Sequence, residues 1–113
     1  MTQVRIASTA IDSTGVEVKK QFIDCAYPVM VMIKNTGAKT VKVTLYGGFD
    51  DTRTDMIPEI ATEGTTDNPH IIAGGQLGLK LENPYDYILV YAVCPTGGET
   101  STIEGALMWQ GPL

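Results

Sequence analysis

Residues 40–46 read Thr-Val-Lys-Val-Thr-Leu-Tyr, so apolar and polar side chains alternate along the whole stretch. Residues 76–82, Gln-Leu-Gly-Leu-Lys-Leu-Glu, repeat this pattern. Because successive side chains of a β-strand point to opposite faces of a sheet, alternation with period two predicts half-buried strands. Weaker versions of the pattern occur around Val4, Val16 and Ile103. The chain is therefore expected to be built from strands.

Turn-forming residues divide the remaining sequence into short pieces. Three Gly-Gly doublets and six prolines lie between the apolar runs, and proline cannot donate to a β-ladder. The only helical candidate is residues 58–63, which Pro58 opens and Gly64 ends, and it allows one turn. Many short strands without helices predict one all-β domain over residues 1–113. The expected fold is an antiparallel β-sandwich, jelly-roll or immunoglobulin-like, of about seven to eight strands.

One connection has clear turn chemistry. Residues 34–38, Lys-Asn-Thr-Gly-Ala, lie between two strongly apolar runs. Asn35 and Gly37 are residue types that tolerate the positive φ angle of a tight hairpin. We therefore expect the strands on either side of residues 34–38 to pair with each other.

Two apolar runs, residues 29–33 and residues 87–93, do not alternate. A two-layer sandwich buries only one face of each strand, so the second face of these strands needs another cover. The sequence leaves two sources open, the connection from residue 50 to residue 72 and another protein molecule. Large uncovered apolar patches on soluble proteins mark interaction surfaces.

Composition limits the classes of partner. Eight Lys and Arg residues against 13 Asp and Glu residues give a net charge of −5, which disfavours binding to the phosphates of nucleic acid. The apolar share of 43% is too high for a disordered chain. Residues 1–11 lack the pattern of a signal peptide, and no apolar run approaches the roughly 20 residues of a membrane span. We expect neither a nucleic-acid partner nor a membrane partner.

Signals for catalysis are weak. His70 is the only histidine, and it follows Asn-Pro in what reads as a loop or a strand start. The sequence holds no nucleophile-elbow motif and no zinc-binding spacing, so we expect a protein that is not an enzyme and needs no cofactor. Cys25 and Cys94 form no Cys-x-x-Cys pair and are expected to be reduced, mostly buried thiols.

Acidic residues gather in one segment. Asp50, Asp51, Asp55 and Asp67 could supply several carboxylate oxygens to calcium, although Arg53 breaks the order of an EF-hand loop. A solvated acidic loop is the simpler interpretation, and no metal site is predicted. Calcium binding by the segment from Asp50 to Asp67 stays an open alternative.

Aromatic residues mark the candidate interface. Tyr46 and Phe49 flank a Gly-Gly doublet at a strand end, and Met108 with Trp109 lies near the C-terminus. Trp and Tyr are favoured at interface hot spots because they are large and rigid. The predicted interface residues are Tyr46, Phe49, Met108 and Trp109. Tyr87 and Tyr91 share a face of an apolar run and are expected in the core. A sugar-binding aromatic platform is the alternative use of the exposed rings.

A likeness to a known class covers residues 16–109. It is carried by residues 32–37, Met-Ile-Lys-Asn-Thr-Gly, which lead into the strand of residues 41–45, and then by residues 72–76 and 87–91. In this style the chain resembles the small β-sandwich structural proteins of tailed-phage virions, especially capsid decoration or cement proteins. The resemblance supplies no residue-level motif.

The resemblance implies a non-enzymatic protein that is made in the host cytoplasm and stabilises the virion at the capsid surface. Its implied partner is the major capsid protein or another virion protein, and proteins of this kind often form homo-oligomers. A tail or neck component of the virion fits the same features. The alternative from a different class is a carbohydrate-binding or adhesive β-sandwich module.

Overall fold

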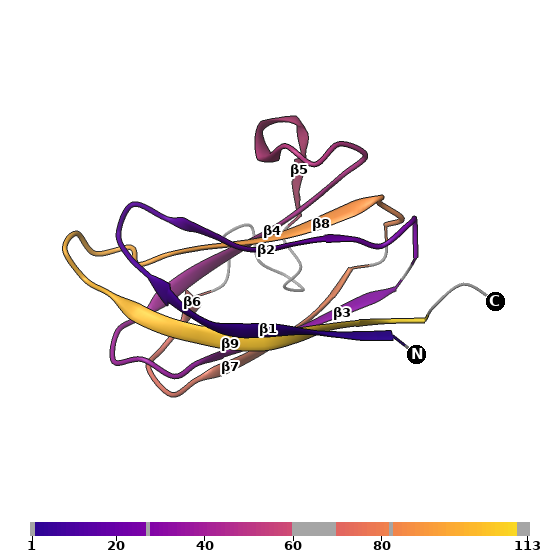
Figure 1. The fold of residues 1–113 in the computed structure, drawn as a ribbon. Coiled ribbons are helices and arrows are strands. Elements are labelled where there is room, and N and C mark those ends of the chain that lie inside the picture. The colour runs from indigo at the N-terminus through magenta and orange to yellow at the C-terminus, as the bar shows by residue number, and fades with distance from the viewer. Residues whose placement is uncertain (1, 27, 60–69, 82, 111–113) are drawn as a thin grey trace.

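The computed structural model describes residues 2–26, 28–59, 70–81 and 83–110 as two antiparallel β-sheets packed face to face (Figure 1). The first sheet has the order β1 (Thr2–Ile11), β9 (Ser101–Trp109), β3 (Val29–Asn35) and β7 (Gln76–Leu81). The second has the order β2 (Val16–Phe22), β8 (Tyr87–Val93), β4 (Val41–Gly48) and β5 (Ile57–Glu59), with β6 (His70–Ile71) also paired to β4. The predicted all-β sandwich is confirmed.

The described residues contain nine strands, more than the seven to eight expected from sequence. Two short strands, β5 and β6, lie in the connection from residue 50 to residue 72, for which the sequence predicts no strand, and both pair with β4. The predicted turn at residues 58–63 is wrong where it can be compared, because Pro58 lies in β5. Residues 60–63 lie outside the described residues. A single 3₁₀ turn, η1 (Arg53–Asp55), lies just ahead of β5 instead.

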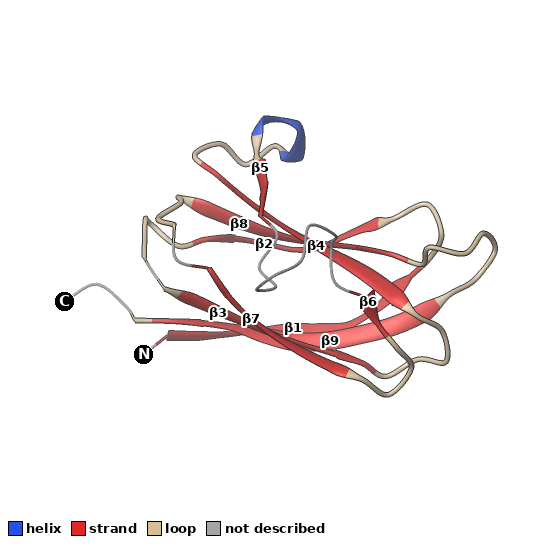
Figure 2. Cartoon of the chain, turned by 180° about the vertical axis from the view of Figure 1, so that it is seen from behind, coloured by secondary structure: helices blue, strands red, loops and turns tan. Residues whose placement is uncertain are grey.

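The order of pairing is that of a jelly roll. β1 pairs with β9, β2 with β8, β3 with β7 and β4 with β5, so each pair nests inside the previous one. The two members of each nested pair lie in one sheet, and successive pairs alternate between sheets. This arrangement is a long hairpin rolled into two layers, and it brings the start of β1 and the end of β9 to one end of the first sheet (Figure 2).

One apolar cluster fills the space between the layers. It takes every second residue of the central strands and of β7, which confirms the alternation read in residues 40–46 and, as far as the structure describes it, in residues 76–81. The inward residues of the four central strands are Val29, Val31, Ile33, Val41, Val43, Leu45, Ile88, Val90, Ala92, Ile103, Leu107 and Trp109.

The predicted hairpin around residues 34–38 is wrong, because β3 and β4 lie in different sheets. The chain instead passes from one sheet to the other between β3 and β4. The side chain of Asn35, which is 0% exposed, forms hydrogen bonds at this connection. Its Nδ2 donates to the carbonyl oxygens of Lys39 at 2.6 Å and Ile71 at 2.9 Å. Its Oδ1 accepts from the amide of Gly37 at 3.1 Å and the hydroxyl of Ser101 at 2.8 Å. Asn35 thus binds parts of both layers, which a tight local hairpin would not do.

The outer face of the second sheet is covered in part by the chain itself, although Phe22 on this face is 50% exposed. Along β8, Ile88 and Val90 point inward, while Leu89 points outward and is nevertheless 0% exposed. Residues 49–56, which we call the covering loop, run over this face and include η1. Figure 1 shows the loop and β5 on the side of the second sheet that faces away from the first.

Three contacts bind the covering loop to the sheet. The Nζ of Lys20 donates to the carbonyl oxygen of Asp51 at 2.9 Å, and the Nε of Arg53 lies 3.6 Å from the Oε1 of Glu17. The guanidinium carbon of Arg53 also lies 4.3 Å from the centre of the Tyr91 ring. Of the two covers left open by the sequence, the one over residues 87–93 comes from the connection after residue 50.

Candidate interaction surface

The outer face of the first sheet differs from that of the second. Along β3, Val29, Val31 and Ile33 are buried, while Met30 and Met32 point outward and are 38% and 39% exposed. The described residues do not cover this face. The run of residues 29–33 therefore has two apolar faces, as expected, but only its inner face is shielded within the chain.

Neighbouring strands continue the apolar surface on both sides of β3. Met30 lies opposite Met108 on β9, and Met32 lies opposite Ala106 on β9 and Gly78 on β7. We call the outward surface formed by these five residues the methionine face. It spans three adjacent strands near the middle of the sheet.

Glycines allow the strands and side chains of this face to lie close together. A Cβ at Gly105 would overlap the carbonyl oxygen of Met32, so a larger residue there would push β9 away from β3. A Cβ at Gly78 would lie 3.3 Å from the Sδ of Met32, which places the end of that side chain over β7. Methionine suits such a surface because its unbranched thioether adapts to different partners.

Two shallow hollows flank the middle of the face. One of about 350 Å³ lies at the start of β3 and is lined by Pro28, Met30, Met108, Trp109 and Gln110. The other, of about 210 Å³, lies farther along β3. It is lined by Arg5, Met32, Ile33, Lys34, Gln76, Glu104, Gly105 and Ala106. The apolar surface thus has recesses that protruding side chains of a partner can fill.

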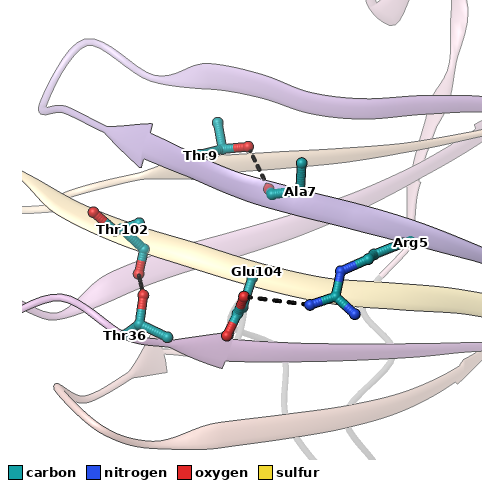
Figure 3. Close-up of polar contacts among 6 residues, drawn as sticks. All are labelled: Arg5, Ala7, Thr9, Thr36, Thr102 and Glu104. Carbon is teal, nitrogen blue, oxygen red and sulfur yellow. Dashed lines mark hydrogen bonds and ion pairs between the residues drawn. The ribbon is translucent and has the colours of Figure 1, made fainter.

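Charged residues stand at the margin of the methionine face. The Nη2 of Arg5 lies 3.9 Å from the Oε2 of Glu104, as Figure 3 shows across β1 and β9. Lys34 lies opposite Glu104, and Lys80 lies opposite Met30. The outward positions of the four strands thus hold three basic residues and one acidic residue.

The edge of this sheet at β1 is distorted. The register of β1 against β9 shifts between Ile6 and Thr9, and the hydroxyl of Thr9 donates to the carbonyl oxygen of Ala7 at 2.8 Å (Figure 3). A bulge of this kind twists an edge strand and disfavours the addition of another strand. The broad face is therefore a better docking surface than the β1 edge.

The four predicted interface residues do not lie together. Tyr46 is on the outer face of the second sheet, where its ring meets that of Tyr91 edge to face at 6.3 Å between centroids. Phe49 is 67% exposed at the start of the covering loop. Met108 belongs to the methionine face, whereas Trp109 is only 7% exposed and packs in the core.

Sequence reasoning did not single out Met30 and Met32. A usable signal exists in Val-Met-Val-Met-Ile, residues 29–33, where β-branched side chains alternate with flexible unbranched ones. Branched residues pack well in a fixed core, while methionine tolerates a variable neighbour. This alternation of branched and unbranched side chains does not show in a polar–apolar pattern, because every residue of the run is apolar.

Two expectations about burial need correction. Tyr87 and Tyr91 point away from the core and are half-buried, because Phe22 packs against Tyr87 and Arg53 against Tyr91. Cys94 is buried as expected, but Cys25 is exposed. The Sγ of Cys25 donates to the Oδ1 of Asp86 at 3.2 Å, and this bond to a carboxylate raises the pKa of the thiol.

The acidic segment shows no arrangement for a cation in the part of the chain that is described. Within that part, no three His, Cys, Asp or Glu side chains are grouped closely enough to hold a metal ion. The carboxylate of Asp51 lies 3.9 Å from the Nζ of Lys20. Asp67 lies outside the described residues. His70 is an exposed residue of β6 that lies opposite Lys42.

No helix among the described residues has the length and apolar character to span a membrane. No family model matches the sequence, and no curated protein matches it. Solved structures that are similar include one described as "Crystal structure of PirA", with a TM-score of 0.61 and 12% sequence identity over 91% of each chain. At that identity the likeness concerns the fold alone, and it agrees with the two-layer β-sandwich described above.

Proposed function

We propose that this chain is a non-enzymatic structural protein that docks on a larger protein assembly through the methionine face. The observation that carries the proposal is the exposure of Met30 and Met32 in the middle of a sheet whose opposite layer is covered by its own loop. Burying such a surface removes apolar area from water, at roughly 25 cal/mol per Å². A partner on the methionine face would therefore remove apolar side chains from water, as the covering loop does on the second sheet.

The assembly that fits the proposal best is a phage capsid, with the major capsid protein or another virion protein as the partner. The support is the likeness in sequence style to capsid decoration proteins, together with a flat, adaptable docking face. Many copies bound to a symmetric shell are held together more firmly than one contact would allow. A tail or neck position in the virion would use the same surface.

A carbohydrate-binding module is less well supported. Such a module needs an open aromatic ring for a sugar to stack on. The ring of Tyr91 has the guanidinium of Arg53 on it and the edge of Tyr46 beside it, and Trp109 is in the core. Phe22 and Phe49 are exposed, but they lie apart from the methionine face, on the side of the second sheet.

Co-sedimentation with empty shells tests the proposal. The shells are assembled from the major capsid protein encoded in the same genome as the chain. We expect the wild-type chain to sediment with them and the double variant Met30→Ser, Met32→Ser to bind at least about tenfold more weakly. Ile57→Ser removes a similarly exposed apolar side chain from β5 and is the control.

Two results would overturn the proposal. If the wild-type chain stays in the supernatant, the capsid assignment is wrong. If the double methionine variant sediments as well as wild type and the Ile57 variant does not, docking uses the other side of the molecule. The homo-oligomer predicted from the sequence stays a prediction, which light scattering over a range of concentrations tests.

A further inference from the structure

We infer that the partner surface recognised by the methionine face is acidic, with an apolar centre and carboxylates around it. This inference rests on the proposed docking function and specifies the chemistry of the partner. It follows from the positions of the basic residues around the apolar centre.

The basic residues come from three strands and surround the apolar centre. Lys80 of β7 is in the same row as Met30 and Met108. Arg5 of β1 is in the same row as Ala106 and Met32. Lys34 follows Met32 two residues later on β3 and points to the same face. A partner that buries the methionines therefore brings its own margin close to all three cations.

The sign of this charge is opposite to that of the chain as a whole. The outward positions of the four strands hold three basic residues against one acidic residue, whereas the full chain has eight against 13. Without these four charged residues, the rest of the chain has five basic and 12 acidic residues. Complementary charges steer two surfaces together and oppose the wrong partners. The local excess of positive charge thus fits a partner rich in Asp and Glu.

Glu104 leaves most of the donors of Arg5 open to a partner. Arg5 and Glu104 approach only to 3.9 Å, and the side chain of Arg5 is 81% exposed. A guanidinium group has five N–H donors, so a distant single pair leaves donors directed at solvent. Arg5 can bind partner carboxylates without first breaking a buried ion pair.

A second copy of the same face is a poor fit. In a two-fold symmetric dimer each face meets itself, so the basic margins of both copies would come together. Like charges in such positions are unfavourable. Nucleic acid fits poorly as well, because none of the outward residues of the four described strands is an aromatic side chain on which a base could stack.

Methyl NMR with two model peptides tests the inference. Both peptides are amphipathic helices of about 18 residues, roughly five turns, with the same leucine face. One has glutamates beside the leucines and the other has lysines. The labelled methionine methyl groups of Met30, Met32 and Met108 report on the face, and the buried Met56 at the end of the covering loop is the internal control.

We expect the glutamate peptide to shift the three reporter signals with an affinity at least about tenfold higher than that of the lysine peptide, and to leave Met56 unchanged. The double variant Arg5→Glu, Lys34→Glu should lose this preference. Lys39→Glu makes the same kind of charge change at an exposed position of the β3–β4 connection and should keep the preference. Matching amide spectra show that each variant is folded.

Three results would overturn the inference. The first is equal affinity for both peptides. The second is a concentration-dependent shift of the reporter signals without peptide, which would identify a second copy as the occupant. The third is a stronger response to phosphatidylglycerol vesicles than to the glutamate peptide, which would identify a lipid surface.

The empty shells separate this inference from the proposed function. If the chain prefers the glutamate peptide but does not sediment with shells, the capsid assignment fails and the acidic partner stands. If the Met30, Met32 double variant loses the shells while the Arg5, Lys34 double variant binds them normally, the docking function stands and the acidic partner fails.

Discussion

The two outer faces of the sandwich begin from similar sequences and end in different states. Residues 87–93 and residues 29–33 are both unbroken apolar runs at the centre of a sheet. On the second sheet, outward-pointing Leu89 is 0% exposed and lies opposite Lys20, which binds the covering loop. On the first sheet, Met30 and Met32 are 38% and 39% exposed. An apolar run shows that both faces of a strand avoid water, but it does not show which molecule supplies the cover.

The cover of the second sheet depends on residues that are far along the chain from residues 87–93. Lys20 binds Asp51, and Glu17 binds Arg53, over separations of about thirty residues or more along the chain. The first sheet has a basic margin in the corresponding place, with no loop bound to it among the described residues. One face is thus partly covered within the chain, and the other is the face that we propose a partner covers.

The largest effect is expected from truncating the covered residue. Leu89→Ala removes a fully buried side chain between a sheet and a loop, and should lower the free energy of unfolding by about 2–5 kcal/mol. Met32→Ala removes a partly exposed side chain and should lower it by less than about 1 kcal/mol. Urea unfolding of both variants measures the difference, and equal losses would show that the two faces are covered alike.

A smaller effect is expected from the glycine between the methionine strand and its neighbour. In Gly105→Ala the new Cβ meets backbone atoms of Met32, so β9 and β3 must move apart, at a cost of about 1–3 kcal/mol. In Gly78→Ala the Cβ meets only the flexible end of the Met32 side chain, and stability should change little. Thermal melting of the two variants makes the comparison. A destabilised Gly78 variant with a stable Gly105 variant would contradict the strand spacing.

A still smaller effect is expected from releasing the covering loop. Arg53→Ala removes a cation–π contact and an exposed ion pair, and should cost about 1 kcal/mol. Amide hydrogens of residues 49–56 should then exchange faster, because the loop opens more often. The matched variant on the methionine face, Arg5→Ala, removes only one long and exposed pair and should cost a few tenths of a kcal/mol. Unchanged exchange in the Arg53 variant would show that other contacts hold the loop.

Local patterns predicted the strands, whereas distant contacts decided how the strands were used. The alternation of residues 40–46 and 76–82 is a property of neighbouring residues and sufficed to predict β4 and β7. The pairing of β3 with β4 was wrong because Asn35 bonds to Ile71 and Ser101, 36 and 66 positions away. Short-range turn chemistry does not reveal those partners.

The candidate site was predicted only in part, for the same reason. Met108 and Trp109 are both predicted interface residues. Trp109 points to the opposite face from Met108, because the side chains of adjacent strand residues alternate. Tyr46 and Phe49 belong to the second sheet and the loop that follows it. Which aromatic residue remains exposed depends on the covering loop, and its anchors Arg53 and Lys20 look like ordinary surface residues in the sequence.

The smallest effect is expected at the turn between β1 and β2, which connects the first sheet to the second. The Oδ1 of Asp12 accepts hydrogen bonds from the hydroxyl of Thr14 at 2.7 Å and from the amides of Thr14 and Gly15, both at 3.0 Å. These bonds, the hydroxyl of Thr14 above all, hold the pKa of Asp12 below its ordinary value. The charged carboxylate is thus favoured in the folded state.

The sign of the pH dependence follows from this direction. Above the unfolded pKa of about 4, the stabilisation by charged Asp12 is fully present, and it is lost as the pH falls through the lower folded pKa. Asp12→Asn keeps an acceptor oxygen but does not ionise. The melting temperature of wild type should therefore exceed that of the variant at pH 6, and the two should converge at pH values below the folded pKa.

Acid should also affect the two faces unequally. The hydroxyl of Tyr91 donates to the carbonyl oxygen of Thr14 at 3.4 Å, so the β1–β2 turn contacts the covered face directly. None of the five residues of the methionine face belongs to this turn. Ring signals of Tyr91 should shift on protonation of Asp12, and the methyl signals of Met30 and Met32 should stay in place. Equal shifts at both faces would mean that the β1–β2 turn couples the two layers through the shared core. The two faces would then respond to acid together, despite their different exposure.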